Sequence, residues 1–242
     1  MMTALLFIVM AMLGTIVQTV SGFGFAIIAM MVFPFLTGNV TTAASIAGLF
    51  ALTNASMNAY TYREHIEWRI VLLPFAAYMV FGTIALECIG KMSNEWMMRL
   101  LGVALICAGL YFFFFQSRIK IKPTKKNAFL AGSISGVLGS LFAIAGPPMA
   151  LYYTMLIENN KYKYLACINA YFLLTNTYIS ILRACNGFLG LVEIKCWLVG
   201  LIGLVLGRVI GGKLLDKVDG VFIKKIVYAV TIMSGIYYII FK

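Results

Sequence analysis

Charged residues are scarce in this chain of 242 residues. They make up 11% of the sequence, whereas 62% of the residues are hydrophobic and the mean hydropathy is +0.97. A soluble globular domain carries about 25% charged residues. The scarcity of charge therefore excludes a soluble domain and predicts an integral membrane protein.

Acidic residues and histidine are scarcer still, with eight Asp and Glu and a single histidine. A membrane-embedded enzyme needs a cluster of acids, nucleophiles or metal ligands. Here the acidic residues are scattered, no HExxH or P-loop motif occurs, and the five cysteines form no CxxC pair. We expect neither an enzyme nor a nucleotide-driven pump, and we expect no metal and no cofactor.

The sequence contains eight long apolar stretches. Most are close to the ~20 residues that a helix needs to cross the hydrocarbon core, and none alternates as the strands of a membrane barrel do. The fold class that we predict is an all-α polytopic membrane protein. The stretches cover residues 3–36, 43–61, 70–90, 97–116, 127–157, 164–183, 196–213 and 225–241.

The net charge of +11 would suggest nucleic acid as a partner of a soluble protein. In this chain, however, the cations lie in the short connections between apolar stretches, where they face lipid head groups and set the orientation. We therefore expect the lipid bilayer as a partner and no nucleic acid. The protein is expected in a cell membrane, as a multi-pass protein of the bacterial inner membrane.

An internal repeat is visible at a separation of 122 residues. Asn54 has Asn176 as its counterpart, Gly24 has Gly146, and six of eleven positions between 44 and 54 are identical to their counterparts. Such self-similarity indicates two related halves. We divide the chain into a first membrane repeat, a basic cytoplasmic linker and a second membrane repeat: residues 1–117, 118–126 and 127–242.

The orientation of the halves depends on segments 21–36 and 144–157. With ten passes, thirteen Lys and Arg lie inside and five outside, whereas eight passes leave hardly any bias. The positive-inside rule thus favours inverted repeats with both termini outside. A helix of 14 to 16 residues reaches only about 21 to 24 Å, less than the ~30 Å core. We expect eight full spans plus two broken or re-entrant segments.

Each of these segments is interrupted by residues that disfavour a continuous helix. Gly22 and Gly24 permit a turn that a side chain would resist, and Gly146, Pro147 and Pro148 interrupt the second half. A helix that restarts after a break begins with unpaired N–H groups and the positive end of its dipole. The two breaks therefore predict an anion site at the membrane midplane, as in transporters with broken helices.

Close helix packing is the alternative reading of glycine in such segments. We prefer packing for two evenly spaced sets of glycines and substrate binding for the breaks themselves. The packing sets are Gly132, Gly136 and Gly139 and, later in the chain, Gly203, Gly207 and Gly211.

Polar residues inside the apolar stretches add candidate ligands. A buried amide without a partner costs about 2 kcal/mol or more, so Asn54 and Asn176 must face a partner, a cavity or each other. Contact between helices is the alternative role. The full set that we expect to line the substrate site is Gln18, Ser21, Gly22, Phe23, Gly24, Asn54, Ser140, Gly146, Pro147, Pro148 and Asn176.

Two arginines within apolar stretches are candidate gates for an anion. Arg183 follows Asn169, Asn176 and Ser180 at helical spacing. Arg208 lies five residues before Lys213, and its alternative role is to extend to the cytoplasmic interface.

Taken together, these residues are similar to the TauE/SafE family of probable sulfite and organosulfonate transporters. The resemblance covers essentially the whole chain and lies in "SGFGFA", "GSISGVLGS" and "GPPMALYY". It implies a permease for sulfur-containing anions such as sulfite or sulfoacetate. The chain departs from the family pattern where Phe23 stands between two glycines and where Leu141 and Phe142 follow Ser140.

The function that we expect is a secondary transporter for a small anion, bound near the midplane between the repeats. The alternatives are a passive anion channel and a permease for another small solute. A cation permease would need carboxylates at depth, and none lies there in the sequence. The sequence does not decide the direction of transport, a coupling proton or a homodimer.

Overall fold

The computed structural model describes the chain except residues 1, 111–121, 123, 158–159, 215–219 and 242. The described residues form α-helices and one short 3-10 turn, without a strand, which confirms the all-α prediction. The elements are α1 (Met2–Ser21), α2 (Phe25–Thr37), α3 (Val40–Thr61), η1 (Arg63–His65), α4 (Trp68–Ile89), α5 (Asn94–Leu110), α6 (Lys125–Phe142), α7 (Gly146–Leu156), α8 (Lys161–Cys185), α9 (Leu191–Leu214) and α10 (Gly220–Phe241).

Five of the described helices are long and apolar enough to cross a membrane: α1, α3, α4, α8 and α9. In contrast, α2 has 13 residues and α7 has 11. At 1.5 Å per residue they measure about 20 Å and 16 Å, less than the ~30 Å of the hydrocarbon core. They occupy the two segments in which short, interrupted helices were expected.

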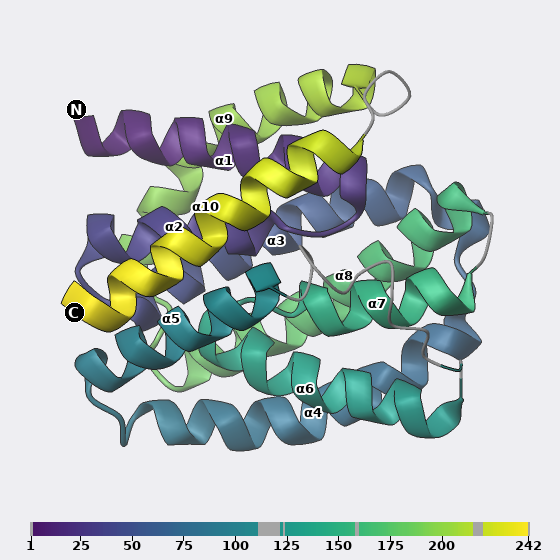
Figure 1. Cartoon of the computed structure of the whole chain (residues 1–242), viewed down its shortest axis with the longest axis horizontal. Coiled ribbons are helices and arrows are strands. Elements are labelled where there is room, and N and C mark those ends of the chain that lie inside the picture. Colours follow the sequence, from purple (N-terminus) through teal and green to yellow (C-terminus); the bar gives the residue numbers. More distant parts are fainter. Residues whose placement is uncertain (1, 111–121, 123, 158–159, 215–219, 242) are drawn as a thin grey trace.

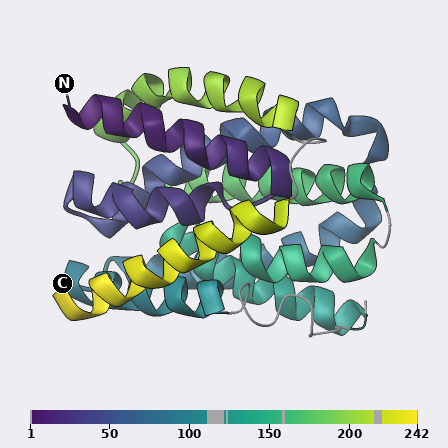
Figure 2. The same ribbon diagram turned by 45° about the horizontal axis from the view of Figure 1, so that its top comes forward.

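The helices pair in a pattern that repeats along the chain. Most run along the long axis of the molecule, and α1 begins at the end where α10 finishes (Figures 1 and 2). The main pairs are α1 with α9, α4 with α6, α5 with α10 and α3 with α8. When the first five helices are matched in order with the last five, the α1–α9 pair corresponds to the α6–α4 pair.

The proposed linker lies mostly outside the described residues. Of residues 118–126, the structure describes Lys122 and the last three. Thr124 caps α6 by accepting a hydrogen bond from the Asn127 amide, and Lys125 and Lys126 form the first turn.

Glycines make the closest helix contacts, as the packing interpretation predicts. On α9, a Cβ at Gly203 would overlap the Ile8 carbonyl oxygen, and one at Gly207 would overlap the Met12 carbonyl oxygen. On α6, a Cβ at Gly132 would overlap the backbone of Pro74. Absence of a side chain thus lets α1 approach α9, and α4 approach α6, at backbone distance.

The two central helices, α3 and α8, carry seven of the fifteen buried polar or charged residues that the structure describes. In α3 and α8, 61% of the most apolar window is buried, against 28% to 39% in the other three long spans. Asn54 and Asn58 on α3 and Asn169 and Asn176 on α8 are all buried. Because these two helices face protein rather than lipid, their amides can be satisfied inside the molecule.

Candidate functional site

The first break is a turn of three residues between α1 and α2. Gly22 has φ 82° and Gly24 has φ 105°, in the region that L side chains avoid, which confirms that this turn requires glycine. The Ser21 hydroxyl lies 2.6 Å from the Phe23 carbonyl oxygen and 2.7 Å from that of Val17, and it can donate its one hydrogen to either. Ser21 therefore stabilises the turn itself.

Helix α2 begins with unpaired donors. Gly24 precedes it without any side-chain cap, and the first bond into the helix runs from the Ile28 amide to the Gly24 carbonyl. The N–H groups of Phe25, Ala26 and Ile27 thus have no partner within the helix. This is the arrangement that the sequence predicted for the first break.

The second break lies earlier than expected. The chain leaves α6 at Ala143, whose φ is 59°, and Gly146 already belongs to α7. The interruption therefore lies at residues 143–145, directly before the Gly146-Pro147-Pro148 run from which it was predicted. Proline lacks an N–H and so fits the first turn of a helix, where these prolines mark the start of α7 after the break.

The prolines also reduce the number of donors. Gly146 supplies the only N–H among the first three residues of α7, because Pro147 and Pro148 have none. The expectation of several unpaired N–H groups at both breaks holds for α2 and is wrong for α7. The two helix starts are therefore chemically unequal. The start of α2 has more free N–H groups that can donate hydrogen bonds to an anion.

Side chains of α6 and α8 hold both breaks in place. The Ser135 hydroxyl donates to the Ala145 carbonyl at 2.7 Å, and the Tyr171 hydroxyl donates to Ser135 at 2.9 Å. At the first break, the Tyr164 hydroxyl donates to the Ser21 carbonyl at 3.3 Å. These supporting residues were missed from sequence, although a serine inside an apolar glycine-rich helix such as Ser135 was a signal.

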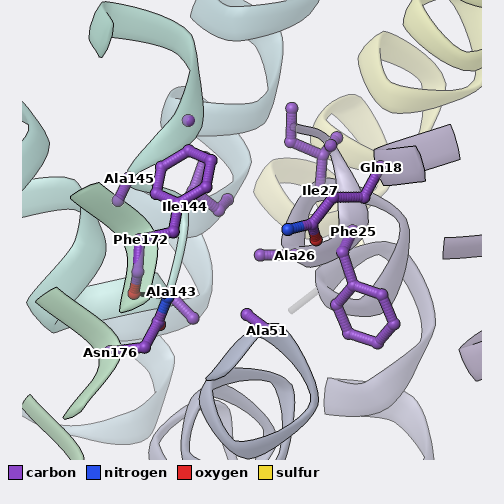
Figure 3. Close-up of a pocket in the computed structure, with 12 residues that line it drawn as sticks. Gln18, Phe25, Ala26, Ile27, Ala51, Ala143, Ile144, Ala145, Phe172 and Asn176 are labelled. Carbon is purple, nitrogen blue, oxygen red and sulfur yellow. Dashed lines mark hydrogen bonds between the residues drawn. The ribbon is translucent and has the colours of Figure 1, made fainter. Parts of the chain in front are cut away.

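The two breaks face each other across a small cavity. Gly146 packs on Phe23, whose side chain would lie 3.2 Å from a Cβ at that position. Figure 3 shows Gln18 and the start of α2 on one side, the second break with Phe172 and Asn176 on the other, and Ala51 between them. The lining residues are Gln18, Gly24, Phe25, Ala26, Ile27, Ala51, Ala143, Ile144, Ala145, Gly146, Phe172 and Asn176.

The cavity is narrow and has few polar side chains. Its volume is about 20 Å³, room for about one water molecule. Gln18 from α1 and Asn176 from α8 are its polar side chains, and the Asn176 amide also donates to the Phe172 carbonyl at 2.8 Å.

Of the predicted site residues, Gln18, Gly24, Gly146 and Asn176 line this cavity. The others lie around it, because they belong to the turns or contact other helices. Those others are Ser21, Gly22, Phe23, Asn54, Ser140, Pro147 and Pro148. Among the lining residues missed from sequence, the alanines and Phe172 carry no chemical signal that separates them from other apolar residues.

Buried amides connect the cavity to α3. Gln18 donates to the Asn169 side-chain oxygen at 3.4 Å, Asn58 donates to the same oxygen at 3.3 Å, and Asn58 lies 3.5 Å from the Asn54 oxygen. These bonds are long. The Asn54 amide nitrogen has no hydrogen-bond partner, and the Asn54 oxygen accepts from Asn58 of the same helix.

Arg183 is 2% exposed and is bound by neutral groups. Its guanidinium donates to the carbonyls of Ser140 (2.6 Å) and Thr41 (3.1 Å) and to the Ser45 hydroxyl (2.8 Å). Ser140 thus contributes its carbonyl near the C-terminus of α6, where a cation is favourable. Arg183 joins α8, α3 and α6 on the side of the cavity toward the start of α3.

Arg208 binds the opposite end of α3. Its guanidinium donates to the Asn58 side-chain oxygen at 2.9 Å, to the Thr61 hydroxyl at 2.6 Å and to the Met57 carbonyl at 3.2 Å. Its guanidinium is thus turned toward α3. Arg183 from α8 and Arg208 from α9 therefore bind opposite ends of α3, and the cavity lies between them.

The described residues include no group of three or more His, Cys, Asp or Glu that could hold a metal ion. The polar groups around the cavity are amides, hydroxyls and guanidiniums, which donate hydrogen bonds. Such a site is suited to an acceptor of hydrogen bonds with negative charge.

Comparison with known proteins shows the family of the chain. No solved structure was found to match the chain. The probable sulfite/organosulfonate exporter TauE of Cupriavidus necator is 29% identical over 145 residues, which cover 56% of this chain and 55% of that relative; the match thus spans about half of the relative's length. The family model described as "Sulfite exporter TauE/SafE" matches residues 6–238. The chain is a multi-pass membrane protein and belongs to the TauE/SafE family.

Proposed function

We propose that the protein is a secondary transporter in the cell membrane for a small sulfur-containing anion, bound in the cavity between the two breaks. The observation that carries this proposal is the start of α2, whose residues Phe25, Ala26 and Ile27 line that cavity and whose first-turn N–H groups have no partner within the helix. Backbone donors at a helix start bind anions because they add to the positive end of the dipole.

The chemistry of the lining favours an oxyanion over a cation. Gln18 and Asn176 supply amide donors beside the backbone groups of α2, and no Asp or Glu lines the cavity. Sulfite and organosulfonates such as sulfoacetate present several oxygen acceptors on one sulfur, which suits donors arriving from α1, α2 and α8. The family description and the printed name of the Cupriavidus relative support the same substrate class.

The small volume supports a carrier over an open pore. A cavity that fits about one water molecule must widen before it holds sulfite. The correspondence between the α1–α9 and α6–α4 pairs supports two inverted repeats, residues 1–117 and 127–242, that rock around the cavity. Arg183 and Arg208 are then candidate gates, one on each side.

Flux measurements test the proposal. Proteoliposomes that contain the protein should take up or release radiolabelled sulfite or an organosulfonate faster than empty liposomes, with saturation as the concentration rises. The measurement is made with and without an imposed proton gradient, which also reports on a coupling proton. Flux equal to that of empty liposomes for every sulfur anion under both conditions would rule out the proposed function.

Counterflow distinguishes a carrier from a passive anion channel, the alternative function. Unlabelled sulfite inside the vesicles should accelerate entry of labelled sulfite, because a carrier returns faster when loaded. A channel would show no such acceleration and no saturation in the same range.

Replacement of Asn176 by leucine should reduce sulfite transport by about tenfold or more, the effect of removing a hydrogen bond to a charged ligand. Asn186→Leu is the matched control, because Asn186 also donates to a carbonyl of its own helix, that of Leu182, but is exposed at the end of α8. Both variants should elute as folded protein in detergent. Equal transport by the two variants would remove Asn176 from the site.

A further inference from the structure

The surroundings of Arg208 differ from those of an arginine that only faces the membrane interface. The guanidinium is half-buried between α9 and α3, and all of its hydrogen bonds go to neutral acceptors on Met57, Asn58 and Thr61. Among the described residues, the one ion pair is between Lys163 and Glu67, and it does not involve Arg208. The charge of Arg208 is thus not neutralised by a carboxylate there.

A half-buried cation without a counter-ion favours an anion beside it. Removing charge from water costs free energy unless an opposite charge compensates it. A guanidinium presents planar N–H pairs that match two oxygens of an oxyanion. Thr61 is exposed, so a solute can reach its hydroxyl and the guanidinium that binds it.

Arg208 is also connected to the cavity by side chains. Asn58 accepts from Arg208 and donates to Asn169, and the same Asn169 oxygen accepts from Gln18, which lines the cavity. The last two bonds measure 3.3 and 3.4 Å, long enough to break readily. The Asn54 amide nitrogen, which has no hydrogen-bond partner, lies one helical turn from Asn58.

We propose that Arg208, Asn58 and Thr61 form a second oxyanion site, separate from the cavity, which loads the substrate from the end of the molecule where α3 finishes. The proposal rests on the proposed function. An oxyanion that takes the Arg208 donors leaves the Asn58 oxygen without its donor. The Asn58 side chain is then free to turn, and the bonds that hold Asn169 and Gln18 across the path to the cavity loosen.

Equilibrium binding of radiolabelled sulfite to the purified protein in detergent tests the second site. The wild type should bind one more sulfite per chain than R208Q, and Asn176→Leu should lose the other sulfite while keeping the Arg208 site. Arg69→Gln is the matched control, since Arg69 is an exposed arginine at the start of α4, eight residues after Thr61 in the chain. It should bind as many sulfite ions as the wild type.

Thr61→Val provides a milder variant in case R208Q does not fold. It removes the exposed hydroxyl that accepts from Arg208 and donates to the Met57 carbonyl, and it should weaken the second binding event by ~10-fold, as for a hydrogen bond to a charged group. R208K keeps the charge without the planar fork and should weaken that event as well.

The outcomes separate the two proposals. If the wild type and R208Q bind the same number of sulfite ions per chain, the second site is overturned. Loss of one bound sulfite in Asn176→Leu would still support binding in the cavity. No binding to any variant overturns both. Nanodiscs of phosphatidylcholine with or without phosphatidylglycerol distinguish a lipid phosphate: if anionic lipid abolishes sulfite binding at Arg208, the site is a lipid site and the loading role is rejected.

Discussion

Replacement of Gly24 by alanine should abolish transport while the protein stays folded. Gly24 has φ 105° and lines the cavity directly before α2. A side chain in this region of φ costs about 1 to 3 kcal/mol, and a Cβ would lie 3.1 Å from the Val17 side chain. Relief of the strain must move the start of α2 and the N–H groups of its first turn. Displacement of binding groups by ~1 Å lowers activity about 100-fold in other sites.

Gly38→Ala is the matched control, because Gly38 ends the same helix with φ 71° and has no atom within 4 Å of its missing Cβ. Both variants carry backbone strain, but Gly38 lies about 20 Å from the start of α2 by the 1.5 Å rise per residue. Sulfite flux per folded protein should be lost in Gly24→Ala and retained in Gly38→Ala. Equal flux in the two variants would separate the first break from transport.

The first break and the close helix contacts are predictable from the sequence for one physical reason. In a bilayer the backbone must satisfy its own hydrogen bonds, so residues that weaken a helix are retained only with a function. Gly22 and Gly24 therefore indicate a turn, and Gly203 and Gly207 indicate a helix contact, and both features are found at these positions.

The exact place of the second break is not predictable in the same way. Proline interrupts a helix when it is internal but starts one when it is in the first turn, and sequence alone does not separate these roles at Pro147. The left-handed residue is Ala143, and alanine rarely adopts that conformation. Its φ accompanies the local bonds that end α6, from the Ala143 amide to the Gly139 carbonyl and from the Ile144 amide to the Leu138 carbonyl, as in a helix C-cap.

The hydrogen-bond partners of the two arginines cannot be predicted from the sequence either. Spacing places Arg183 and Arg208 on helices, but which neighbour each guanidinium meets depends on how helices about 140 to 150 residues apart in the chain pack, as for Ser45 with Arg183 and Asn58 with Arg208. The alanines that line the cavity present the same difficulty, because Ala51 differs from a lipid-facing alanine only by its position.

Replacement of Gly203 by alanine should cause the largest loss of stability. The added Cβ would overlap the Ile8 carbonyl oxygen and lie 2.8 Å from the carbonyl carbon, and backbone cannot turn aside as a side chain can. Overpacking of this kind costs on the order of 3 kcal/mol, which at about 2 to 4 °C per kcal/mol corresponds to a drop of ~6 to 12 °C in the midpoint of thermal unfolding. The midpoint is measured in detergent by size-exclusion chromatography after heating.

Gly212→Ala on the same helix isolates the cause. A Cβ at Gly212 meets no atom within 4 Å, so this change should keep or raise the midpoint, by up to ~1 kcal/mol from the higher helix propensity of alanine. Since α1 carries Gln18 and the first break, its displacement in Gly203→Ala should also lower sulfite flux at temperatures where the protein is still folded. An unchanged midpoint in Gly203→Ala would mean that α1 and α9 are not in backbone contact, and the pairing of α1 with α9 that supports the inverted repeats would have to be abandoned.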